Sequence, residues 1–139
     1  MNEFHKKDSM KTPPQRVLPV LEKMKKAYQL WRLIHERLPK TQRYTIGNRI
    51  DKLFVESIEA IVTAGFLPPA EKLPWIRSAL RKNDTKQVFI QLLWETKTLD
   101  DKDYIDLATT LADVGKDLGG WNGKLTKQNS APTSVGAKK

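Results

Sequence analysis

Lysine and arginine side chains recur along the chain at spacings that suit binding to phosphate. Arg77 and Arg81 are four residues apart, so on a helix their guanidinium groups project from one face and can bridge successive phosphates. Lys82 and Lys86 continue this basic run. The other basic candidates for contact with a nucleic-acid backbone are Lys25, Arg32, Lys40, Arg43, Arg49 and Lys52. On spacing alone, a solvated charged face explains the pattern equally well.

The charge is unevenly distributed along the chain. The 139 residues carry a net charge of +9. Residues 1–44 hold 11 Lys and Arg against 4 Asp and Glu, whereas residues 99–121 hold 2 against 6. Such asymmetry favours an anionic partner for the basic part of the protein, and nucleic acid is the most common partner of this kind.

Other kinds of functional site lack a matching pattern. His5 and His35 belong to no spacing typical of metal ligands, so we expect no metal and no cofactor. The glycines at 115–120 follow a predicted helix, whereas a phosphate-binding loop follows a strand and precedes a helix. Carboxylates such as Glu56 and Glu59 lie mostly off the apolar positions, which favours a solvated face. We therefore expect no catalytic activity.

The composition also bears on the compartment. The chain has no Cys, which excludes disulfides and thiolate catalysis and fits a reducing environment. Residues 1–7 lack the apolar core of a signal peptide, and no window reaches the roughly 18 uncharged residues of a membrane span. We expect a soluble, cytoplasmic protein.

Apolar residues recur at steps of three and four in the first half of the chain, which predicts two helices. The first covers about 17–38 and ends at Pro39, because the residue before a proline resists the α region. A tight basic turn follows. The second helix runs from about residue 46 to Gly65, with Thr41 or Thr45 available as its N-cap.

Two further helices are predicted in the second half. The third begins near Lys72 with Pro74 in its first turn, and the polar pair at 83–84 interrupts its apolar pattern, which includes Val88 and Leu92. The fourth begins after an N-cap within the acidic run at 100–103 and ends at the glycine pair 119–120 through a left-handed C-cap.

These elements predict an all-α protein. Four helices joined by short loops pack most simply as an antiparallel up-down four-helix bundle, which we expect over residues 17–121. Residues 1–16 and 122–139 are polar and show no helical period, so we predict a disordered basic N-terminal tail and a disordered C-terminal tail.

Aromatic residues offer two interpretations, because they can stack on nucleic-acid bases or fill a core. Most of them fit the apolar positions of the predicted helices, which favours the core. Trp75 flanks a helix start and Trp94 lies at the edge of an apolar face. These two are the candidates for a subunit or partner interface.

Two tracts carry a resemblance to a known family. They read Leu-Pro-Lys followed by Arg-Tyr-Thr-Ile-Gly within 38–50, and Val-Gly-Lys-Asp-Leu-Gly-Gly-Trp at 114–121. From the first predicted helix to Trp121, about three quarters of the chain resembles the accessory variability proteins of diversity-generating retroelements. The small bundle proteins encoded in intervening sequences of large-subunit ribosomal RNA genes are related to them.

The resemblance implies an antiparallel four-helix bundle that assembles as a barrel-like homopentamer with a basic surface. It also implies that the chain binds the reverse transcriptase and the template RNA of a retroelement and supports mutagenic copying into a variable gene. Our first hypothesis is therefore a non-catalytic accessory protein whose partners are a reverse transcriptase and RNA, or DNA.

Two other classes of function remain. One is a protein interaction module that does not bind nucleic acid and uses its charge for solubility and partner steering. The other is an amphipathic protein of the membrane surface, which is disfavoured because the apolar faces are needed to close the bundle.

Overall fold

The computed structural model of the chain describes residues 18–137, and the side chains of residues 19–130. All regular structure in this range is helical, which confirms the all-α prediction for these residues. The four long helices are α2 (Leu18–Arg37), α4 (Asn48–Gly65), α5 (Pro69–Glu95) and α6 (Asp101–Ala137). Two short segments, α3 (Lys40–Gln42) and the π-helical turn η1 (Arg43–Gly47), lead from α2 into α4. The predicted tail at 1–16 lies outside the described residues.

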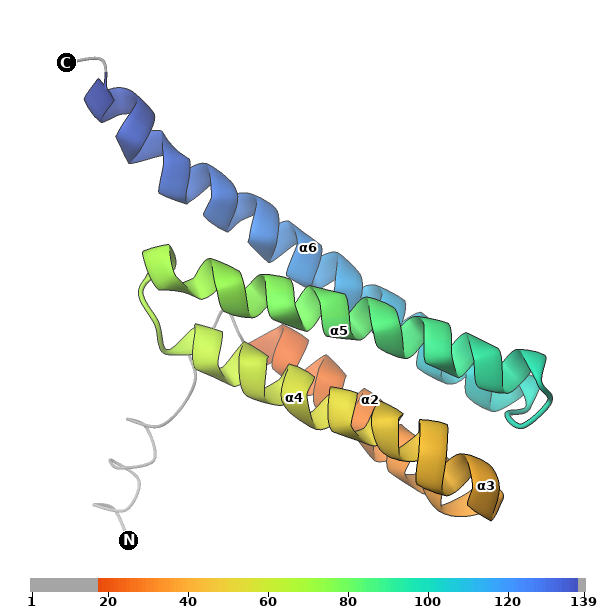
Figure 1. Cartoon of the computed structure of the whole chain (residues 1–139). Helices are drawn as coiled ribbons and strands as arrows, with labels where there is room; N and C mark the ends of the chain where they lie inside the picture. The colour runs from red at the N-terminus through yellow and green to blue at the C-terminus, as the bar shows by residue number, and fades with distance from the viewer. Residues whose placement is uncertain (1–17, 138–139) are drawn as a thin grey trace, which may run out of the picture.

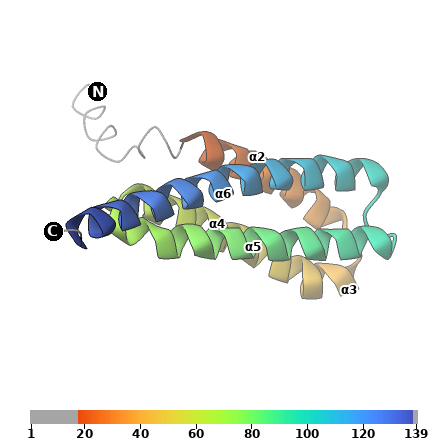
Figure 2. The same cartoon turned by 90° about the horizontal axis from the view of Figure 1, so that it is seen from above.

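The long helices lie side by side (Figures 1 and 2). Helix α2 contacts α4 and α6, and α5 contacts the same two helices. The four helices therefore share one core. Helix α6 is the longest and extends past the start of α5, where Asn129 Nδ2 donates a hydrogen bond to the Pro69 carbonyl at 3.2 Å (Figure 1).

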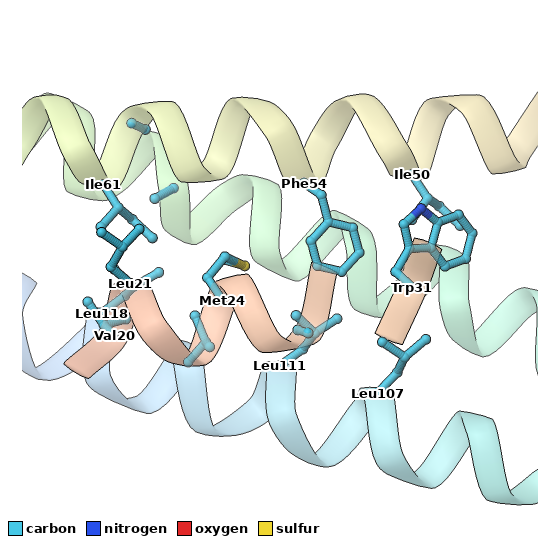
Figure 3. Close-up of a cluster of buried hydrophobic side chains, with 14 of the residues drawn as sticks. Val20, Leu21, Met24, Trp31, Ile50, Phe54, Ile61, Leu107, Leu111 and Leu118 are labelled. Atoms are coloured by element: carbon cyan, nitrogen blue, oxygen red, sulfur yellow. The ribbon is translucent and has the colours of Figure 1, made fainter. Parts of the chain in front are cut away.

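The core is built from apolar residues that recur at steps of three and four. Trp31 of α2, Phe54 of α4, Ile90 of α5 and Leu111 of α6 are all fully buried. Figure 3 shows labelled side chains of α2, α4 and α6 gathered in this core. Burial of each such side chain contributes about 1.5–3 kcal/mol, so this shared core supplies the main force that holds the helices together.

The predicted end of the first helix is confirmed, because α2 ends at Arg37, just before Leu38 and Pro39. The following turn is shorter than predicted, since the chain is helical again from Lys40. Thr45 lies inside the helical segment, where its hydroxyl donates to the Thr41 carbonyl at 2.6 Å. The prediction that either threonine caps a helix beginning near 46 is therefore wrong.

Helix α5 begins earlier than predicted and runs without a break. Pro69 takes the first helical position, where its missing N–H costs nothing, and Pro74 lies inside the helix. The polar residue Asn83 does not interrupt it. Its side chain is fully buried and donates to the Leu111 carbonyl of α6 at 2.9 Å. The residue that interrupts the apolar pattern thus ties two helices together.

Two residues predicted on the apolar face of this helix point away from the core. Val88 is 60% exposed and Leu92 is 45% exposed. The interior positions of α5 at this level belong to Asn83, Lys86 and Ile90, which are all fully buried. Because one face of a helix holds only three or four residues in two turns, the inward polar residues leave Val88 and Leu92 outside.

The start of α6 is confirmed and its end is not. Asp100 is the N-cap, since its Oδ1 accepts a hydrogen bond from the Asp103 backbone N–H at 2.8 Å. Gly119 and Gly120 lie within the helix, and no glycine of the described chain has a positive φ. The helix continues because Leu125 follows Trp121 by one turn and is also buried. The predicted disordered tail is therefore wrong for residues 122–137.

Candidate nucleic-acid interface

The predicted basic residues do not form one group. Lys40, Arg43 and Arg49 surround α3, at the end of the molecule opposite the start of α5 (Figure 1). Arg77 and Arg81 are both exposed and lie in the first half of α5. A single short nucleic-acid segment therefore does not span all of the predicted residues along one face.

Three of the predicted residues are engaged in ion pairs. Lys25 Nζ lies 3.1 Å from a Glu22 carboxylate oxygen. Arg32 lies 3.6 Å from Asp51 across the α2–α4 contact and 4.0 Å from Glu36. Lys52 lies 3.9 Å from Glu56. These carboxylates offset the positive charge of Lys25, Arg32 and Lys52, which weakens the attraction of this side for a polyanion.

Two other predicted residues make hydrogen bonds within the protein. The half-buried Arg43 donates from Nε and Nη2 to the Leu38 carbonyl, at 3.2 and 3.0 Å. This carbonyl follows the end of α2, so Arg43 satisfies a backbone acceptor that the helix leaves open. Lys82 donates to the Ser78 hydroxyl at 3.0 Å and is also half-buried.

Lys86 does not lie at the predicted interface. Its side chain is fully buried, and its amine lies 3.1 Å from Ser57 Oγ and 3.2 Å from Met24 Sδ. A phosphate cannot reach this amine while the helices remain packed. The prediction that Lys86 extends the exposed run of Arg77 and Arg81 is therefore wrong.

The structure brings Arg77 beside α6. Its guanidinium donates to Asn122 Oδ1 at 3.2 Å and to Thr126 Oγ1 at 3.4 Å. The same stretch of α6 exposes three lysines. We use the name α5–α6 basic band for five exposed basic residues of these two helices, Arg77, Arg81, Lys116, Lys124 and Lys127, of which Lys116 and Lys124 lie on the side of α6 toward α2.

The lysines of this band were missed by the sequence analysis. The predicted helix end at 119–120 placed Lys124 and Lys127 in a tail, away from any defined surface. The spacing of Leu118, Trp121 and Leu125, which continues the apolar face of α6, was the signal that could have located them.

A surface cavity of about 430 Å³ lies between α2 and α6 beside the band. Lys23, Lys116 and Lys124 line it together with Trp121 and Gly120. Asp117 and Asp113 lie 2.9 and 3.0 Å from Lys23 Nζ. The hydrogen bonds that Lys23 Nζ donates to the carboxylates of Asp117 and Asp113 raise the pKa of Lys23. The two carboxylates offset part of the positive charge of Lys23, Lys116 and Lys124. The cavity therefore keeps a small net positive charge.

Three glycines of α6 lie next to the band, and close packing does not require glycine at any of these positions. A Cβ added at Gly119, Gly120 or Gly123 would have no heavy atom within 4 Å. None of these glycines has a positive φ. Because glycine in a helix interior costs about 1 kcal/mol relative to alanine, this stretch gives up helix stability. Its surface has no side chains there, so a partner can approach the helix backbone closely.

The two tryptophans predicted at an interface are partly exposed, Trp75 by 42% and Trp94 by 36%. Trp94 stacks on Tyr104, with ring centroids 4.4 Å apart and an angle of 9° between the planes. Its Nε1 donates to Asp101 Oδ1 at 2.8 Å. A cavity of about 740 Å³ lies beside Trp94 at the turn from α5 to α6. The role of both tryptophans at an interface stays a prediction.

His35 has a structural position. It is buried, it stacks on Trp31 with ring centroids 5.2 Å apart, and its Nε2 lies 3.2 Å from the Arg43 carbonyl oxygen. His5 lies outside the described residues. Among the residues that the structure describes, no three His, Cys, Asp or Glu side chains are placed to hold a metal ion. No helix in this part of the chain is long and apolar enough to cross a bilayer.

Comparisons with known proteins give no relative. No family model, no curated protein and no solved structure matches the chain. The function is therefore inferred from the geometry of the α5–α6 basic band and from the two tracts within 38–50 and 114–121.

Proposed function

We propose that this protein is a non-catalytic accessory protein of a diversity-generating retroelement that binds RNA and a reverse transcriptase in the cytoplasm. The observation that carries RNA binding is the α5–α6 basic band. Exposed lysine and arginine side chains on two adjacent helices suit a phosphate backbone, whose contacts supply most of the sequence-independent affinity for nucleic acid. The bare helix surface at Gly119, Gly120 and Gly123 supports close approach of that backbone.

Three parts of the proposal rest on the resemblance of the two tracts to the accessory variability proteins: binding to a reverse transcriptase, membership of a retroelement, and assembly into an oligomer. The tract at 114–121 overlaps the basic band, which supports a shared role for the two features. The proposal includes an antiparallel up-down bundle, supported by the mutual contacts of the four long helices and their short connections. It also includes a homopentamer, in which Trp75 and Trp94 contribute exposed aromatic surface for subunit contact.

The test of RNA binding is a double charge reversal in the band. Arg77→Glu combined with Arg81→Glu should abolish binding to a fluorescently labelled single-stranded or structured RNA, measured by anisotropy. The matched control is Lys97→Glu combined with Lys102→Glu, which makes the same change in net charge in the connection between α5 and α6 and in the first turn of α6. Circular dichroism should show unchanged helicity in both variants, because exposed charges contribute little to folding.

The salt dependence separates specific contact from general charge attraction. For the unmodified protein, log K against log salt should slope by roughly −0.7 for each phosphate neutralised on a single strand, and each lost contact should flatten the slope by that amount. If the double variant bound RNA as tightly as the unmodified protein, the proposal that the band contacts RNA would be wrong. Equal loss in the control pair would show that net charge alone attracts RNA.

The alternative is a protein interaction module without nucleic-acid binding. The observation that favours it is Trp94, which stacks on Tyr104 and lines a surface cavity, since a partly exposed aromatic surface suits a protein partner. If a band variant lost a co-expressed reverse transcriptase while RNA binding did not change, the band would be a protein-docking surface, and absence of RNA binding by the unmodified protein as well would favour this alternative. A reverse-transcriptase gene with template and variable repeats beside this gene would favour the retroelement.

A further inference from the structure

A lysine amine lies in the core, where α5 meets α4 and α2. Lys86 of α5 is fully buried. Its Nζ donates to Ser57 Oγ of α4 at 3.1 Å and lies 3.2 Å from Met24 Sδ of α2. The same nitrogen lies 4.2 Å from the centroid of the Phe54 ring. A hydroxyl, a thioether and an aromatic face thus surround the amine, and none of these groups carries a charge.

The polar layer continues through Asn83, one turn before Lys86 on the same face of α5. Asn83 is fully buried and its amide nitrogen donates to the Leu111 carbonyl of α6 at 2.9 Å. Its Oδ1 has no hydrogen-bond partner within the described residues. Gly115 allows this close packing, because a Cβ there would lie 3.2 Å from Asn83 Nδ2. One layer of α5 therefore touches all three other long helices through polar groups.

This surrounding suits a neutral amine better than an ammonium ion. Moving a charged group into a low-dielectric interior is costly unless a counter-charge lies close by. Burial alone lowers the pKa of Lys86 from its usual 10.5 to about 7. In the folded protein the amine therefore changes its charge near neutral pH, far below the range of an exposed lysine.

Titratable and charged groups of the surrounding helices interact with residues other than Lys86. On the α2–α4 side, Arg32 lies 3.6 Å from Asp51. Tyr28 packs on Phe54, with ring centroids 5.5 Å apart, and burial together with Asp51 raises its pKa, so its phenol stays neutral to a higher pH than that of an ordinary tyrosine. On α5, Lys82 donates to Ser78. On α6, the layer meets the Leu111 carbonyl and Gly115, which carry no charge.

We propose that the Lys86 layer is a proton-controlled switch in the bundle, in which protonation of the buried amine loosens α5 from α2 and α4. The ammonium form has three N–H groups and a full charge but only neutral neighbours. Local separation of α5 admits water to the amine and to the open acceptor of Asn83. The neutral form restores the dry contact with Met24, Ser57 and Phe54. This switch is independent of the proposed binding of RNA.

The direction of the pH effect follows from the proton balance. Between pH 7 and the usual lysine range, the unfolded chain holds a proton on Lys86 that the folded protein lacks. Folding stability from this group therefore increases as pH rises through that interval. Below about pH 7 both states are protonated and this contribution is lost.

Urea unfolding of the full chain at pH 6, 7, 8 and 9 tests the switch. Relative to Lys86→Met, the unfolding equilibrium constant of the unmodified protein should fall by up to about tenfold per pH unit between 7 and 9. The matched control is Lys82→Met, which removes a lysine one turn away on the same helix that lies outside the buried layer. It should keep the full pH dependence of the unmodified protein.

Hydrogen exchange of the unmodified protein then shows where the opening occurs and requires no variant to fold. After correction for the intrinsic effect of pH on exchange, amides of α5 around Ile90 should be less protected at pH 6 than at pH 8, with a smaller change around Leu118 of α6. Equal pH dependence of unfolding in the unmodified protein and Lys86→Met would overturn the proposal. An equal loss of protection in all four long helices would also overturn it, because a local release of α5 would then be absent.

Discussion

Gly47 packs directly against the ring of His35. A Cβ atom at position 47 would lie 2.9 Å from His35 Cδ2 and 2.9 Å from the Gln42 carbonyl oxygen. The His35 ring has little freedom to move away, because it stacks on Trp31 and its Nε2 lies 3.2 Å from the Arg43 carbonyl oxygen. The glycine in the tract at 38–50 is therefore required by close packing between α2 and the start of α4.

Gly47→Ala should destabilise the protein by about 1–3 kcal/mol, because the added methyl group overpacks a site closed by a ring and a backbone carbonyl. Gly120→Ala is the control, since the corresponding space is open. That change should stabilise the protein by about 1 kcal/mol through helix propensity. Urea denaturation measures both values. Stabilisation of the protein by Gly47→Ala would contradict the packing described here.

Ile50→Ala and Leu111→Ala should each cost roughly 2–5 kcal/mol, because both side chains are fully buried in the shared core and their loss leaves a cavity. Chemical denaturation followed by circular dichroism gives the two free energies of unfolding. An exposed alternative on the same helix as Leu111, Ile105→Ala, should change stability by less than about 0.5 kcal/mol. Equal effects of Leu111→Ala and Ile105→Ala would show that the phase of α6 is wrong.

Leu125→Ala tests the part of α6 that lies beyond the glycine pair. The side chain is 1% exposed, so its truncation should cost about 2 kcal/mol or more. The exposed neighbour Gln128 provides the comparison, and Gln128→Ala should be nearly neutral. Thermal unfolding distinguishes the two. If Leu125→Ala were also neutral, residues beyond 121 would not be packed on the core in solution.

Assembly can be measured by sedimentation at micromolar concentration. If Trp75 and Trp94 contribute to subunit contact, the unmodified protein should form one discrete species several times the monomer mass. The double change Trp75→Ala and Trp94→Ala should shift that species toward the monomer, because large aromatic side chains dominate the energy of interfaces. A monomer across the whole concentration range would remove the proposed homopentamer.

The candidate site was predicted only in part. The spacing of Arg77 and Arg81 correctly placed both on the exposed side of one helix, because a step of four residues keeps side chains on one face. The same spacing argument failed for Lys86, which lies on the buried face. Charge alone does not tell which face of a helix will be inward, since a buried amine depends on partners from other helices.

Where a helix begins or ends depends mainly on local chemistry, and the sequence by itself determined several such points. Pro39 follows the end of α2, and Asp100 caps the first turn of α6. Both effects act through a few adjacent residues, so they can be predicted from the sequence alone. The all-α class follows in the same way from the repeated steps of three and four among apolar residues.

Only the tertiary structure decided which residues of α5 face the core and how far α6 extends. Lys86 lies inside because α2 and α4 supply Met24, Ser57 and Phe54 around its amine. Helix α6 continues past Gly119 and Gly120 because burial of Leu125 outweighs the helix-breaking tendency of the glycines. In both cases the stabilising contacts come from residues distant in sequence, so the local pattern alone does not decide the outcome.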